Sequence, residues 1–65
     1  MPIPGRDLRR ERLLADVTVV AVAARMGLSR QALWAMERAA VVAPERAAQY
    51  RRALQELIEA SRSAA

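Results

Sequence analysis

The side chains best suited to chemistry in this chain gather in one segment, SRQALWAMER, which spans residues 29–38. Arg30 and Gln31 stand next to each other there, and the chain's single tryptophan, Trp34, follows a few residues later. Arginine can form two hydrogen bonds with O6 and N7 of guanine, and glutamine can pair in the same way with adenine. The chemistry open to this segment is therefore hydrogen bonding to base edges, although both residues would also be ordinary on a solvated helix surface.

No catalytic arrangement accompanies these residues. Asp7 and Glu11 are four residues apart, but they lie among arginines and are expected to form surface ion pairs. The serines have no histidine to activate them, and the two glycines cannot build a phosphate-binding loop. Because the chain lacks both histidine and cysteine, nearly every transition-metal site is excluded as well. We expect no enzymatic activity, no metal and no cofactor.

Size and charge point to a small domain with a polyanionic partner. A chain of 65 residues buries only about 60% of its unfolded surface, so compact helix packing or dimerisation is expected to support the fold. The net charge is +4, carried by eleven arginines and no lysine. Such an excess favours nucleic acid as the partner.

No segment reads as a targeting or membrane signal. The first residues contain prolines and charges rather than an apolar core, so no signal peptide is expected. The longest uncharged apolar run, residues 17–24, is far too short to cross a bilayer. We expect a cytoplasmic protein without a membrane partner or an evident small-molecule ligand.

Four helices are expected to position the candidate residues. Residues 1–5, MPIPG, form a short arm because their prolines restrict the backbone. A first helix is predicted over 6–15, with Leu8, Leu13 and Ala15 inward. Asp16 should end it, because aspartate tolerates the left-handed conformation found at helix ends.

The segment VTVVAVAARM, residues 17–26, is ambiguous between strand and helix. Its β-branched residues favour a strand. Thr18 is, however, a suitable N-cap, and Gly27 is a natural helix stop. A lone strand would also have no partner in so short a chain, so we predict a helix over 18–26.

Two further helices are predicted after Gly27. Ser29 is expected to cap a helix over 29–38, and Pro44 with Glu45 is typical of the start of another, over 44–60. The inward stripe of this last helix consists of Ala47, Tyr50, Leu54, Leu57 and Ile58. Residues 61–65 are expected to be a frayed tail, which leaves residues 6–60 as the folded domain.

The second and third predicted helices, joined by a tight glycine turn, have the pattern of a helix-turn-helix. The close crossing of the two helices needs a small residue, which Ala23 supplies. The turn needs a positive φ, which Gly27 allows. The apolar residues around the turn have the required spacing, and they are Val22, Met26, Leu28, Leu33 and Met36.

With these residues in place, the chain resembles the Cro and CI repressor (XRE-like) helix-turn-helix family. Leu8 and Arg12 match the family's leucine with arginine four residues later, and Val17 with Thr18 matches its start of the second helix. Ser29, Leu33 and the pair Glu37-Arg38 match its recognition helix. The resemblance implies an all-α, lambda-repressor-like domain of bacterial or phage origin. It also implies an ion pair between Arg12 and Glu37.

The resemblance assigns roles to particular residues. Those in base-reading positions are Arg30, Gln31, Trp34 and Ala35. Candidates for contact with the DNA backbone are Ser29, Arg38, Arg25, Arg10 and Arg9, although each of these arginines would also be at home as a solvated charge. Trp34 has two readings, because its indole can face DNA or fold back into the core. Ala35 can touch a thymine methyl or can simply be small enough for close approach.

The function that follows is sequence-specific binding of a double-stranded DNA operator by a Cro- or repressor-like transcriptional regulator. The alternative is a protein-interaction module, such as an antitoxin-like or polymerase-binding adaptor that uses the apolar loop AAVVAP and the last helix. The residues predicted for a homodimer or partner surface are Val41, Val42, Leu57 and Ile58. For all four residues core packing is an open alternative, and one of Leu57 and Ile58 is expected in the core and the other at the interface.

Overall fold

The computed structural model describes residues 1–63, which form a compact all-α domain of four helices and so confirm the predicted fold class. The helices are α1 (Gly5–Leu14), α2 (Val19–Met26), α3 (Arg30–Arg38) and α4 (Pro44–Ser63). Residues 61–63 of the predicted tail are helical, and residues 64–65 lie outside the described part of the chain. None of these described helices has the length and apolar character needed to cross a membrane.

Local capping chemistry determines where α2 and α3 begin and where α2 ends. The Thr18 side chain accepts a hydrogen bond from the backbone N–H of Ala21, and the Ser29 hydroxyl accepts one from that of Ala32, each at 3.1 Å. Gly27 closes α2 in the left-handed conformation, with φ 71°. The helical prediction for residues 18–26 is therefore confirmed against the strand alternative.

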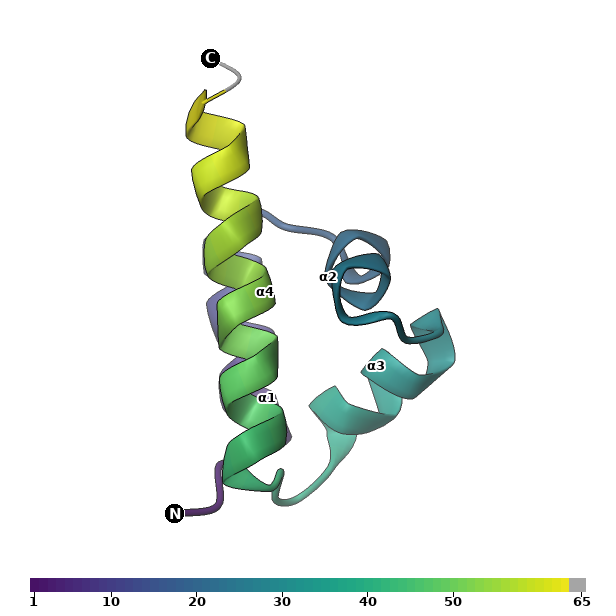
Figure 1. Ribbon diagram of the computed structural model, residues 1–65. Helices are drawn as coiled ribbons and strands as arrows, with labels where there is room; N and C mark the ends of the chain where they lie inside the picture. The colour runs from purple at the N-terminus through teal and green to yellow at the C-terminus, as the bar shows by residue number, and fades with distance from the viewer. Residues whose placement is uncertain (64–65) are drawn as a thin grey trace.

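The four helices pack in a closed arrangement. In Figure 1, α2 and α3 lie on the same side of the long helix α4, while α1 runs behind α4. Helix α2 packs on both α4 and α3, and α1 packs on both α3 and α4. Helix α3 is thus held from two directions, by α1 and by α2, and its remaining surface faces away from the core.

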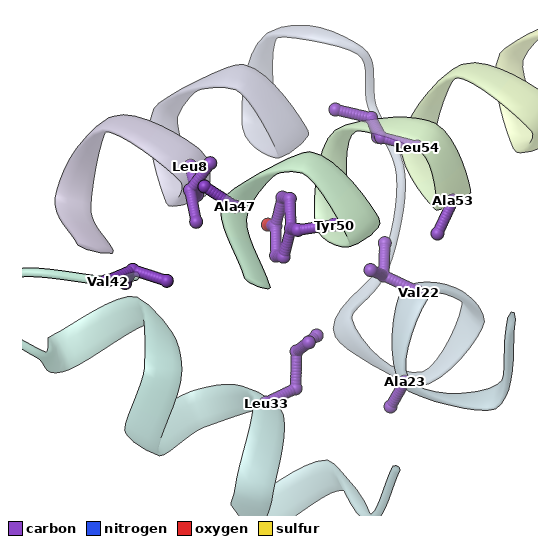
Figure 2. Packing of buried hydrophobic residues seen from close by; sticks show 9 residues of the cluster. All are labelled: Leu8, Val22, Ala23, Leu33, Val42, Ala47, Tyr50, Ala53 and Leu54. Atoms are coloured by element: carbon purple, nitrogen blue, oxygen red, sulfur yellow. The ribbon is translucent and has the colours of Figure 1, made fainter. Parts of the chain in front are cut away.

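The core gathers around Tyr50, which lies at the centre of the buried cluster in Figure 2. The buried hydrophobic residues are Leu8, Val22, Ala23, Leu33, Val42, Ala47, Tyr50, Ala53 and Leu54. The predicted inward position of Leu13 is wrong, because its side chain is 51% exposed. Leu13 follows buried Leu8 by five residues, and at about 100° per residue its side chain points roughly 140° away from that of Leu8. Arg12 takes the inward position instead.

The N-terminal segment is fastened to the loop between α3 and α4. Ile3 and Val42 form an antiparallel β-bridge, and the N–H of Gly5 donates to the carbonyl of Ala39 at 3.0 Å. Gly5 itself is buried at the first position of α1, and a Cβ there would collide with the backbone carbonyl of Met36. The absence of a side chain at Gly5 therefore lets α1 begin directly against the end of α3.

Candidate nucleic-acid interface

Helix α3 has an inner and an outer face. Leu33 and Glu37, one turn apart, are buried, and Met36 is partly buried against the core. The opposite side is exposed, and we call it the outer face of α3: Arg30, Gln31, Trp34, Ala35 and Arg38. The residues predicted to read bases therefore share one exposed surface.

The turn before α3 places this face. Ala23 is buried where α2 meets the core, and the N–H of Leu28 donates to its carbonyl at 2.8 Å. The left-handed Gly27 reverses the chain between them. Ser29 then begins α3 with its hydroxyl engaged as the N-cap. Arg30 and Gln31, the first two residues of α3, consequently project from the end of the helix nearest the turn.

A buried polar network anchors the inner face of α3 to two other helices. Arg12 of α1 donates to Glu37 of α3 through Nε at 2.8 Å and through Nη2 at 3.2 Å. The hydroxyl of Tyr50 of α4 donates to the same carboxylate at 2.7 Å, and Arg12 Nη1 donates to the Val17 carbonyl at 2.9 Å. The predicted Arg12–Glu37 pair is thus present. Tyr50 joins it, although the sequence predicted only that this tyrosine lies in the core and not that it forms this hydrogen bond.

This network shifts the pKa values of two of its members. The hydrogen bond from Arg12 to Glu37 raises the pKa of the guanidinium, against the opposing effect of burial. Burial raises the pKa of the Tyr50 phenol well above its ordinary value, and its hydrogen bond to Glu37 raises it further. Both groups therefore keep their protons at neutral pH, and the charges of Arg12 and Glu37 balance each other.

Trp34 is on the surface, so the core placement that its sequence allowed is not the one adopted. Its side chain is 39% exposed. The guanidinium carbon of Arg30, one turn earlier, lies 5.2 Å from the centroid of the indole ring. This distance is typical of a cation–π contact, which holds the two side chains together on the outer face of α3.

The arginines predicted to contact a DNA backbone have different surroundings. Arg25 pairs with Glu56 of α4 at 3.0 Å, so part of its charge is already compensated. Arg10 is exposed on α1. Arg9 and Arg38 instead lie together in a surface depression between α1 and α3, here called the arginine hollow, whose lining includes Pro4, Arg6, Arg9, Trp34 and Arg38. No local pattern signals this hollow, because its walls come from helices far apart in sequence.

The predicted partner surface is only partly available. Val42 is 5% exposed, so its prediction as a surface residue is wrong: its pairing with Ile3 turns it into the core. Val41 is 62% exposed, while Leu57 and Ile58 are half-buried against the core. The most exposed leucine, Leu14 at 78%, was not among the predicted partner residues.

Comparisons with known proteins assign no family. No family model matches this chain, and no curated protein or solved structure matches it either.

Proposed function

We propose that this protein binds double-stranded DNA in a sequence-specific manner and acts as a transcriptional regulator of the Cro and repressor type. In this proposal α3 is the recognition helix. The observation that carries it is the outer face of α3, where Arg30 and Gln31 are exposed beside Trp34 while the inner face is locked by Leu33 and Glu37.

The dimensions of α3 suit a major groove. With its side chains an α-helix is about 10–12 Å across, and the major groove of B-DNA is about 12 Å wide. In helix-turn-helix proteins the N-terminal residues of the second helix contact the base edges. Arg30 and Gln31 are the first two residues of α3, and arginine and glutamine are the side chains that pair best with guanine and adenine.

The charge on α3 supports the same proposal. The single acid of this helix is Glu37, which is buried and paired with Arg12. The outer face of α3 consequently carries Arg30 and Arg38 and no carboxylate. A phosphate backbone on either side of this face would meet positive charge without a repelling acid.

The test is a selection of binding sites from a random pool of DNA duplexes. Wild type is expected to enrich one motif. The double variant Arg30→Ala/Gln31→Ala should keep its helical circular dichroism and enrich none. A matched control, Arg52→Ala/Gln55→Ala, removes the same residue types from the exposed side of α4 and should enrich the wild-type motif. Enrichment of that motif by the α3 variant would argue against the proposal.

A homodimer forms part of the proposal, because two copies would suit a pseudo-palindromic operator. Its support is a shallow depression at the end of α1, where exposed Leu14 lies with Leu54 and half-buried Ile58 beside the Glu11–Arg51 ion pair. Wild type is expected to sediment as a dimer, and Leu14→Glu as a monomer. The alternative of a protein-interaction module has less support, since its apolar loop has Val42 buried in the core.

A further inference from the structure

Arg30 and Trp34 lie one turn apart on the outer face of α3, where helical spacing brings their side chains together. Residues four apart in sequence are neighbours on the surface of a helix. Side chains in a helix also lean toward its N-terminus, so the indole of Trp34 extends back toward the turn that carries Arg30. The guanidinium carbon of Arg30 accordingly lies over the indole ring, 5.2 Å from its centroid.

The indole is a firm support for this contact. More than half of the surface of Trp34 is covered, and its side chain borders the arginine hollow together with Pro4 and Arg38. A tryptophan side chain is also rigid and loses little conformational freedom when it packs. The ring therefore restricts the movement of the flexible arginine that lies over it.

Arg30 has no stronger partner to draw it away. Among residues 1–63, none of the side-chain hydrogen bonds or ion pairs formed by an arginine uses its guanidinium. The single acid of α3, Glu37, is buried and engaged with Arg12. The cation–π contact with Trp34 is thus the interaction that restrains Arg30.

A guanidinium restrained in this way keeps its capacity for hydrogen bonding. It stacks on a ring with its flat face, whereas its N–H donors lie in its plane and stay free. Fixing a mobile side chain on a ligand costs conformational entropy, and a side chain that is restrained beforehand loses less. Trp34 therefore restrains Arg30 without occupying the donors that a guanine requires.

We propose that Trp34 is a positioning residue for Arg30, whose guanidinium it holds ready for a guanine while contacting no base itself. This inference rests on the proposed function, within which it changes the role of Trp34 from base reading to the support of a neighbour. Trp34 then determines how strongly guanine is preferred at the base pair that Arg30 contacts. Preferences at the other base pairs of the operator do not depend on it.

The experiment measures the preference for guanine at that base pair, as the ratio of dissociation constants for duplexes with another base and with guanine there. Arg30→Ala identifies the base pair, because it should lower this preference by about 5- to 150-fold, the discrimination of one paired contact. Trp34→Leu should lower the same preference by about two- to fivefold, which corresponds to an exposed cation–π contact. Trp34→Phe keeps an aromatic ring and should lower it less.

Pairs of substitutions distinguish support of Arg30 from direct contact with a base. In the Arg30→Ala background, Trp34→Leu should have no further effect at any base pair, because no guanidinium is left to position. In the matched Gln31→Ala background its full effect should remain, since a neutral amide forms no cation–π contact. An effect of Trp34→Leu that persists in the Arg30→Ala protein would show that Trp34 reads a base itself, and it would overturn the inference.

A measurement without DNA tests the contact by itself. Trp34 is the chain's single tryptophan, so its fluorescence reports on this site alone. Arg30→Ala uncovers the ring and should increase quenching by acrylamide, a neutral quencher, whereas Gln31→Ala should leave quenching as it is in wild type. Equal quenching in all three proteins would also overturn the inference.

These results separate the role of Trp34 from the proposed function. If wild type enriches a motif but Trp34→Leu keeps the full preference for guanine, the proposed function stands and the role of Trp34 is refuted. If wild type enriches no motif, both are refuted, whatever the quenching shows.

Discussion

Replacing Glu37 by glutamine tests whether the buried network holds α3 in place. The change is nearly isosteric, but it removes the carboxylate that accepts hydrogen bonds from Arg12 and Tyr50. Arg12 would keep its charge in a buried position without an opposite charge beside it. Breaking a buried pair in this way costs about 3–5 kcal/mol.

The size of that loss can be set against the whole stability of the domain. At about 0.05–0.15 kcal/mol per residue, a chain of 65 residues has roughly 3–10 kcal/mol to lose. Glu37→Gln is therefore expected to leave the domain marginally folded or unfolded. Tyr50→Phe removes a single hydrogen bond to a charged group and should cost about 1.5–3 kcal/mol.

Urea unfolding followed by far-ultraviolet circular dichroism measures both losses. The matched control is Glu11→Gln, which removes the carboxylate that pairs with Arg51 at 2.6 Å on the surface. Because the side chains of Arg51 and Glu11 are both well exposed, this change should lower the free energy of unfolding by less than about 1 kcal/mol. If Glu37→Gln cost no more than Glu11→Gln, the network would not hold α3 as argued.

A change of pH and a substitution at Gly5 test the same packing of α3 against α1 and α4. The raised pKa of Tyr50 means that the unfolded chain loses this proton first, so stability should hold up to about pH 9 and fall above about pH 10. The free energy of unfolding, measured by urea titration across that range, should fall by up to about 1.4 kcal/mol per pH unit, and Tyr50→Phe should remove this component of the fall. Gly5→Ala forces a Cβ against the backbone carbonyl groups of Met36 and Glu37 in α3. Thermal unfolding should therefore show that the free energy of unfolding falls by about 1–3 kcal/mol. An unchanged melting temperature would show that the start of α1 does not pack tightly on α3.

Local chemistry made most of the fold predictable from the sequence. The cap residues Thr18 and Ser29 and the left-handed Gly27 act within a few residues of their own positions, so their roles could be inferred directly. Asp16 likewise adopts the predicted left-handed conformation, with φ 58°. The Arg12–Glu37 pair spans a longer distance in sequence, and it was the family resemblance that pointed to it.

Features that depend on distant segments were missed. Val42 was predicted on the surface because nothing in its own loop shows that Ile3 pairs with it. The hydrogen bond of Tyr50 to Glu37 was missed for the same reason, since helical periodicity gives only the inward direction of a side chain. The arginine hollow forms where α1 and α3 approach each other closely at Gly5, and the spacing of residues within either helix does not predict that approach.

The central claim is that the outer face of α3 distinguishes one DNA sequence from another. The most direct measurement is the ratio of two dissociation constants of the wild-type protein, one for its selected duplex and one for a scrambled duplex of the same composition, at one salt concentration. Sequence-specific proteins reach ratios of about 10³ or more, and we predict a ratio of at least that order. A ratio near one, with both duplexes bound, would contradict the claim.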